Sequence, residues 1–121
     1  MVRAGNNHGT IVRVSKEKIA LTLRIAESGD SHAIAEMSRE YIESGLGWRY
    51  DPAHIQRAMR RRETVVLAAT ARQTYVARDR QALSGFAIMD FGDERAHLVL
   101  LAVQPTQRRR GIGRRLVEWL L

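Results

Sequence analysis

The sequence predicts an α/β fold in which a mixed, mostly antiparallel sheet is flanked by helices. Three observations support this class. An early strand is followed by two helical segments, three β-branched or apolar segments come next, and a glycine-rich loop then opens a last helix. Helical and strand periods in this order are typical of a layered α/β domain, and 121 residues suit a single domain.

Residues 1–18 are expected to form a polar, flexible leader, with a short strand over residues 10–14 as an option. The structured domain is then expected to span residues 19–121. Its first strand is predicted over residues 21–26, where apolar and polar side chains alternate weakly.

Capping residues locate two helices after this strand. Asp30 is a suitable N-cap for the first helix, which is expected to end near Gly45 or Gly47. Asp51 followed by Pro52 is a more specific start signal for the second, because proline is favoured at the first helical position. The inner faces are expected to carry Ile34, Met37, Tyr41 and Ile42 in the first helix and Ile55, Ala58 and Met59 in the second.

Three apolar segments in the second half of the chain are predicted strands, over residues 64–69, 83–91 and 96–103. Gly92-Asp93-Glu94 is typical of a hairpin turn between the last two. Residues 96–103 are almost wholly apolar, which indicates a strand covered on both faces. Residues 72–81 either extend a strand pair or form an inserted loop.

The composition excludes several classes of site. Cysteine is absent, which rules out disulfides, thiolate metal sites and a cysteine nucleophile, and no metal is expected. No apolar run is long enough to cross a bilayer and the N-terminus lacks a secretory core, so a cytoplasmic protein without membrane contact is expected. The net charge of +7 rests on scattered arginines, which favour anionic partners without choosing between nucleic acid and a phosphorylated cofactor.

The most informative segment lies between Val103 and Leu116. A buried strand ends at Pro105, and a short arginine-rich loop then leads through Gly111 and Gly113 into a helix. The first turn of a helix has unpaired N–H groups and a partial positive charge. Glycine lets an anion approach the backbone, and arginine adds charge-assisted donors. This segment therefore predicts a pyrophosphate-binding loop.

The loop resembles the signature of the GNAT family of N-acetyltransferases: Arg or Gln, two residues, Gly, one residue, then Gly or Ala. Arg108, Gly111 and Gly113 match it in register, as do the Val-x-Pro before it and Leu116 after it. The resemblance also covers the order of elements from about residue 21 to residue 121. The glycine spacing does not fit a Rossmann site, and a P-loop is excluded by the missing Gly-Lys-Ser/Thr.

The resemblance implies a co-substrate and a site for it. The family moves an acetyl group from acetyl-CoA to an amine, here a primary amine of a protein N-terminus or of a small molecule. By this likeness the backbone of Leu101, Ala102 and Val103 holds the pantetheine arm and polarises the thioester. The pyrophosphate is then held, mostly by main-chain N–H groups, at Arg108, Arg109, Arg110, Gly111, Ile112, Gly113 and Arg114.

The sequence identifies the catalytic and acceptor-binding residues less specifically than the residues of the pyrophosphate loop. His97 and Glu94 are candidate bases for the amine proton, the alternatives being a core histidine bonded to a carbonyl and a solvated turn carboxylate. Trp48 and Tyr50 either line the acceptor pocket or cap the core. The acid of the family is usually a tyrosine on a later helix, and no tyrosine in this sequence matches it by position: the three present are Tyr41, Tyr50 and Tyr75.

Two other functions stay open at this point: a CoA-binding module without turnover, and a basic nucleic-acid-binding domain, which is less expected. Family members continue beyond the helix that follows the loop, so a C-terminally short domain is expected. The strand over residues 96–103 would then have an open edge with uncovered Leu98, Leu100 and Leu101. Such an edge predicts a homodimer or another form of self-association.

Overall fold

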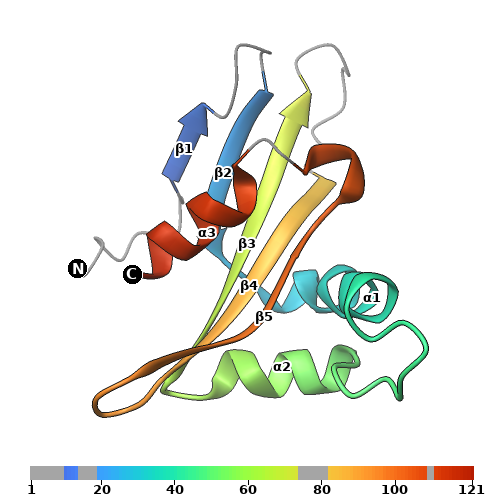
Figure 1. The fold of residues 1–121 in the computed structure, drawn as a ribbon, viewed down its shortest axis with the longest axis vertical. Helices are drawn as coiled ribbons and strands as arrows, with labels where there is room; N and C mark the ends of the chain where they lie inside the picture. Colours follow the sequence, from blue (N-terminus) through green and yellow to red (C-terminus); the bar gives the residue numbers. More distant parts are fainter. Residues whose placement is uncertain (1–9, 14–18, 74–81, 109–110) are drawn as a thin grey trace.

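The computed structural model describes residues 10–13, 19–73, 82–108 and 111–121 (Figure 1). In these residues a five-stranded sheet has the order β1-β2-β3-β4-β5, and every pair of neighbours is antiparallel. The strands are β1 (Thr10–Arg13), β2 (Ile19–Ile25), β3 (Thr64–Gln73), β4 (Ala82–Phe91) and β5 (Ala96–Val103). The helices are α1 (Ser31–Tyr41), α2 (Pro52–Arg60) and α3 (Ile112–Leu120), with short 3-10 turns η1 (Ser28–Asp30) and η2 (Pro105–Gln107).

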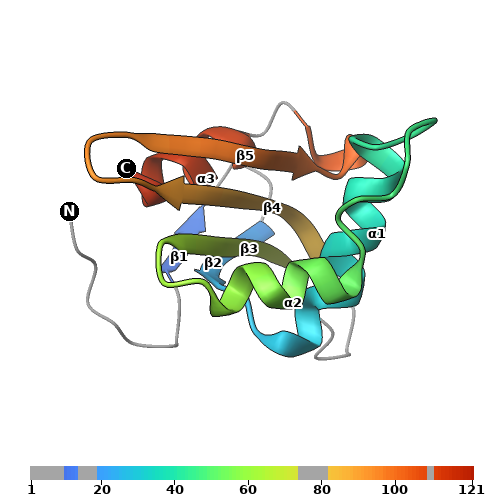
Figure 2. The same cartoon turned by 90° about the horizontal axis from the view of Figure 1, so that it is seen from below.

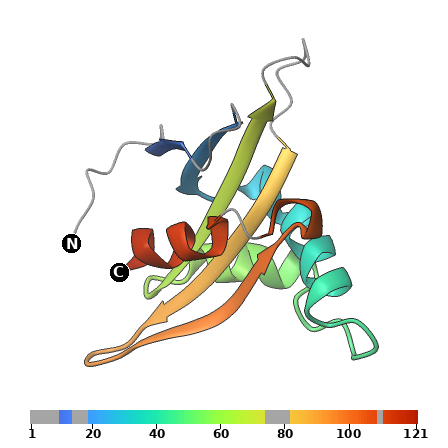
Figure 3. The same ribbon diagram turned by 45° about the horizontal axis from the view of Figure 1, so that its top comes forward.

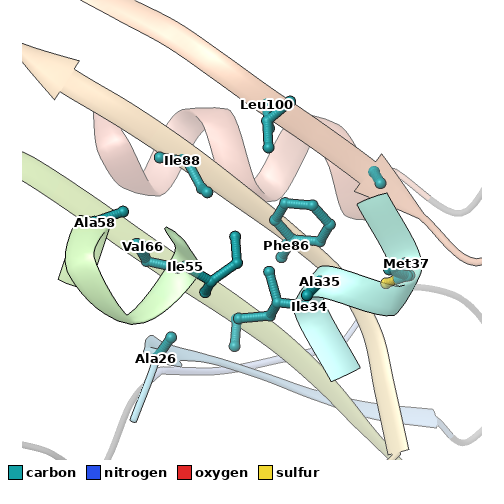
Figure 4. Close-up of a cluster of buried hydrophobic side chains, with 12 residues drawn as sticks. Ala26, Ile34, Ala35, Met37, Ile55, Ala58, Val66, Phe86, Ile88 and Leu100 are labelled. Atoms are coloured by element: carbon teal, nitrogen blue, oxygen red, sulfur yellow. The ribbon is translucent and has the colours of Figure 1, made fainter. Parts of the chain in front are cut away.

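The three helices cover the sheet from both sides, which confirms the predicted layered α/β class. Helices α1 and α2 lie on one face and α3 crosses the other (Figure 3). On the first face Phe86, Ile34 and Ile55 meet between the sheet and both helices (Figure 4). The core on the second face joins α3 to the three central strands and consists of Leu21, Leu23, Leu67, Ala69, Ala87, Met89, Ile112, Leu116 and Leu120. No helix in the described part of the chain is long and apolar enough to span a membrane.

Several element boundaries differ from the sequence expectation because strand pairing extends them. Residues 10–13, for which a short strand was one of the two options, form the edge strand β1, in which Thr10 pairs with Leu23. β3 continues past residue 69 to Gln73 because β2 pairs along it as far as Ile19. The rest of the leader and residues 74–81 lie outside the described residues.

The two predicted caps have different outcomes. Asp51 caps α2 as expected, because its Oδ1 accepts a hydrogen bond from the His54 N–H at 2.8 Å. Asp30 precedes α1 but makes no cap bond to it. Its carboxylate instead accepts two bonds from the Arg24 guanidinium, at 2.6 and 2.8 Å, and one from the Glu27 N–H. Asp30 therefore ties the end of β2 to the start of α1.

β5 was expected to be covered on both faces, and this is wrong for its first half. Ala96, His97 and Leu98 are exposed, Leu98 to 39%, because the β4–β5 hairpin projects past α3 (Figure 3). Leu100 was expected to be uncovered, yet it is only 8% exposed and belongs to the core beneath α1 and α2. Only the hairpin half of β5 lacks a covering layer.

Candidate cofactor and acceptor site

β5 contains a bulge at Val99. Ile88 on β4 pairs with Leu100 and the next residue, Met89, pairs with Leu98, so Val99 has no partner on β4. A bulge interrupts the hydrogen-bond ladder and changes the direction of the local backbone groups. Because β5 is an edge strand of the described sheet, those groups lie beside an open edge. Nothing in the sequence marked Val99, whose side chain packs against the same core as that of Leu100.

Past the bulge, the backbone of Leu101 and Val103 faces the open edge. The Gln104 N–H donates to the Ser84 carbonyl on β4 at 2.7 Å, so Gln104 is directed toward the sheet. Successive residues of an antiparallel edge strand alternate between the neighbouring strand and the free side. Val103 is thus directed outward, in agreement with the bond that its carbonyl accepts from the Arg108 Nε at 3.1 Å. Of the three predicted pantetheine contacts, the backbone of Leu101 and the N–H of Val103 therefore face the open edge, whereas the Val103 carbonyl is bonded to Arg108 and the backbone groups of Ala102 face Phe86 on β4.

The N-terminus of α3 lies against the same end of β5. Gly111 adopts a left-handed conformation, with φ of +75°, and its carbonyl accepts the first helical bond from the Arg115 N–H at 3.0 Å. The N–H groups of Ile112, Gly113 and Arg114 precede that bond and form the donor end of the helix. A methyl group placed on Gly113 would lie 3.6 Å from the Val103 Cγ2. The helix donors and the open strand edge therefore form one continuous surface.

The described arginines of the loop have distinct surroundings. Arg108 donates to the Val103 carbonyl, and its guanidinium lies 5.6 Å from the centroid of the Tyr41 ring. The Tyr41 hydroxyl in turn donates to the Gln104 Oε1 at 2.9 Å. Arg114 pairs with Glu118 at 3.0 Å, so its charge is partly compensated and its backbone N–H is the better anion donor. Arg109 and Arg110 lie outside the described residues.

His97 and Glu94 are placed differently relative to the bulge. His97 is exposed, which excludes the core-histidine alternative, and it pairs with Asp90. Asp90 is two residues after Ile88, which faces α1 and α2, so His97 lies on that same side of the sheet. It is two residues from Val99, about 7 Å along a strand. Glu94 is exposed in the hairpin turn, before the start of β5, and is therefore farther from Val99 along the chain than His97 is.

The loop between α1 and α2 separates the two aromatic candidates. Trp48 lines a cavity of about 650 Å³ on the outer side of α1, and its Nε1 donates to the Ala35 carbonyl at 3.2 Å. Tyr50 is half-buried against the α1–α2 core, with its ring 4.6 Å from that of His54. Helix α1 lies beside the end of β5 (Figure 2), and several of its residues line the cavity. The cavity is lined by Glu36, Arg39, Glu40, Glu43, Ser44, Gly45, Leu46 and Trp48.

Fold and site together define a layered α/β protein that can hold a phosphorylated cofactor between a bulged edge strand and a helix N-terminus. The model of the acetyltransferase (GNAT) family matches residues 33–121, and the chain belongs to this family. It is therefore an acetyl-CoA-dependent N-acetyltransferase of the GNAT type, and the resemblance inferred from the loop is confirmed. A search of curated proteins found no match.

Two of three solved structures of similar fold name an acceptor, and the two acceptors differ. Ribosomal-protein-alanine N-acetyltransferase from Brucella melitensis biovar Abortus 2308 has a TM-score of 0.62 and 20% identity, over 84% of this chain and 69% of that one. PaiA N-acetyltransferase from Thermoplasma acidophilum, in complex with coenzyme A, has a TM-score of 0.64 and 20% identity, over 83% and 69%. An aminoglycoside 6'-N-acetyltransferase complexed with coenzyme A has a TM-score of 0.60 and 20% identity, over 81% and 52%. These identities establish a shared fold.

Proposed function

We propose that this chain transfers the acetyl group of acetyl-CoA to a primary amine of a protein N-terminus or of a small molecule bound beside the α1–α2 loop. The observation that carries the proposal is the continuity of the open, bulged edge of β5 with the donor end of α3. Helix α1 joins the two sides of the site, because Tyr41 bonds to Gln104 while the outer face of α1 lines the cavity. Family membership favours this function over a nucleic-acid-binding domain.

The described residues fit a CoA-type ligand. Three helix N–H groups and Arg108 form a pyrophosphate site, and the adjoining edge groups of Leu101 and Val103 match the spaced amides of a pantetheine arm. A backbone N–H beside the bulge is proposed to polarise the thioester carbonyl. When bound, acetyl-CoA supplies an activated acyl group. Arg109 and Arg110 are proposed to add positive charge to the phosphate site, and Arg114 is proposed to contribute its backbone N–H.

His97 is proposed to accept the proton of the amine. Its exposure permits proton transfer through water, and it lies on the side of the sheet that carries α1 and α2. Glu94 is the second candidate, and its distance from the bulge makes it the weaker one. Trp48 is proposed to contact the acceptor directly, whereas Tyr50 supports the loop from the core side.

Substitution of Gly113 tests the cofactor assignment. Valine should overfill the space between α3 and β5, displace the helix donors and weaken CoA binding about 30-fold or more, which calorimetric titration measures. Alanine is the matched control, because its methyl group would make ordinary contacts of 3.6 Å with Val103 and 3.9 Å with Leu101. We expect its affinity to stay within about threefold of the original. A folded Gly113→Val variant with unchanged CoA affinity would contradict the proposal.

A CoA-binding module without turnover is the second candidate function, and one hydrogen bond favours it. The Tyr41 hydroxyl donates to Gln104, so its proton is directed away from a leaving thiolate at the edge. Incubation with acetyl-CoA and either an alanine-terminated peptide or an aminoglycoside, followed by mass spectrometry, separates the two functions. Acetylated product supports transfer and identifies the acceptor class; CoA binding without product supports the module.

Self-association is proposed to occur through the same edge of β5. The first half of the strand is uncovered and includes the exposed Leu98. Unpaired backbone groups beside an exposed apolar side chain favour pairing with another strand. A second copy of the chain is the partner proposed here.

A further inference from the structure

We infer that Glu43 is a positioning residue whose carboxylate fixes the α1–α2 loop in the shape that places Trp48 at the acceptor cavity. The inference rests on the proposed function, because that function assigns the cavity to the acceptor. Glu43 follows the end of α1 and is only 7% exposed, which is unusual for a carboxylate in a loop. None of the proposed steps of acetyl transfer uses it.

The carboxylate joins both ends of the loop. Its Oε2 accepts a hydrogen bond from the Ser38 hydroxyl of α1 at 2.9 Å. Its Oε1 accepts the N–H of Arg49 at 2.8 Å and that of Tyr50 at 3.2 Å. A buried carboxylate needs such charge-assisted bonds to offset its desolvation. Asp51 follows directly and caps α2, so the bonds of Glu43 also fix where the second helix begins.

The intervening residues have little else to hold them. Ser44, Gly45, Leu46 and Gly47 are all exposed, and Leu46 is 72% exposed, so burial in the core does not fix their conformation. The Leu46 N–H donates to the carbonyl of Glu43 itself at 2.9 Å. The path of this segment therefore depends chiefly on Glu43.

The bonds of Glu43 also determine the position of Trp48. It immediately precedes Arg49, whose N–H makes the shortest of the backbone bonds to Glu43. Its own indole bond to Ala35, at 3.2 Å, and the Arg39 guanidinium 5.1 Å from its ring hold the side chain against α1 only when the backbone is in place. Glu43 and Trp48 both line the 650 Å³ cavity. Loss of the anchor should therefore change the cavity wall without changing the cofactor loop.

Two variants of Glu43 separate geometry from charge. Glu43→Ala removes all the bonds, whereas Glu43→Gln keeps a carbonyl oxygen for the two backbone N–H groups and an amide to face Ser38. Acrylamide quenching of Trp48 fluorescence, in a Trp119→Phe background, reports loop order without any acceptor. Steady-state kinetics with sisomicin or an alanine-terminated peptide, whichever is acetylated, report acceptor binding.

We expect Glu43→Ala to raise the quenching constant about threefold and the acceptor KM about tenfold, with kcat and CoA affinity within about threefold of the original. Glu43→Gln should remain within about threefold in all four quantities. Unchanged Trp48 quenching in Glu43→Ala would overturn the inference, and so would a Glu43→Gln variant as impaired as the alanine variant. If Glu43→Ala fails to fold by circular dichroism, Ser38→Ala takes its place, with a smaller rise in quenching expected and no rise overturning the inference.

Trp48→Ala separates this inference from the proposed function. A raised acceptor KM in Trp48→Ala supports the acceptor assignment on which Glu43 depends. If the acceptor KM is unchanged in Trp48→Ala, the assignment of the cavity to the acceptor is wrong. The role of Glu43 in acceptor binding is then wrong too, even if Glu43→Ala still changes the quenching of Trp48. A Glu43→Ala variant with normal quenching, beside a Trp48→Ala variant with a raised KM, overturns the role of Glu43 alone.

Discussion

A methyl group at Gly85 should damage the sheet at the strand that carries the cofactor edge. Gly85 on β4 pairs with Val103 on β5, and an alanine Cβ there would lie 2.8 Å from the Ala102 carbonyl oxygen. It would also lie 3.3 Å from the Val103 Cγ2 and 3.4 Å from the Leu116 Cδ1. The closest obstacle is backbone rather than the flexible end of a side chain, so β5 must move. Overpacking of this kind costs about 1–3 kcal/mol.

The net effect is smaller because alanine also restricts the unfolded chain, which stabilises the folded state by about 0.4–1 kcal/mol. We therefore expect Gly85→Ala to lower the free energy of unfolding by about 1–2 kcal/mol, or the Tm by about 5–10 °C. Thermal and urea unfolding followed by circular dichroism measure this change. Gly29→Ala is the matched control, because its methyl group would meet nothing within 4 Å. A Gly85→Ala variant as stable as the control would refute the close approach of β4 and β5.

Three further predictions concern other parts of the molecule. The hydrogen bonds from Arg24 lower the pKa of Asp30 from its ordinary value of 3.8, although burial acts in the opposite direction. The ionised carboxylate therefore stabilises the folded protein fully above pH 3.8. This stabilisation is lost as the pH falls through the lowered pKa of the folded state. Asp30→Asn should therefore lower the free energy of unfolding by about 1–2 kcal/mol at neutral pH, measured by urea unfolding, and should remove this dependence on acid. If the variant lowers the free energy of unfolding equally in acid, the prediction is wrong. His97→Gln should reduce kcat/KM about 100-fold with CoA affinity unchanged, whereas Glu94→Gln should leave kcat/KM near the original value. If Glu94→Gln has the larger effect, Glu94 rather than His97 is the better candidate for the base. Leu98→Lys should shift light scattering toward the monomer across a concentration series, and an original chain that is already monomeric at high concentration would count against association through β5.

Local signals accounted for the parts of the fold that short segments determine. Asp51-Pro52 located α2 to the residue because the cap and the proline act within one turn. The glycines of the loop located α3 for the same reason, since Gly111 needs a left-handed conformation that few other residues adopt readily. The family signature depends on that local backbone, and the family and the start of α3 were therefore predictable.

Contacts between distant segments were not predictable in the same way. The bulge at Val99 depends on the register of β4 against β5, and an apolar residue in an apolar run carries no mark of it. The anchor role of Glu43 requires that Ser38 and Tyr50 come together across an exposed loop. The burial of Leu100, expected to be uncovered, depends on where α1 and α2 end over the sheet. The bulge and the burial of Leu100 are long-range properties that spacing along the chain does not encode, whereas the bonds of Glu43 span only five to seven residues and depend on the fold of the loop between α1 and α2.

At Val99, regular pairing of β5 with β4 and the proposed role of the bulge require different backbone conformations. Removal of Val99 alone would bring the pairs Ile88–Leu100 and Met89–Leu98 next to each other, so the ladder would become continuous while every neighbouring side chain kept its face of the sheet. What would disappear is the break that redirects backbone groups toward the open edge. A shorter strand would thus be the better β-strand and, on the proposed function, the poorer acetyltransferase, so selection for thermal stability alone would favour loss of Val99.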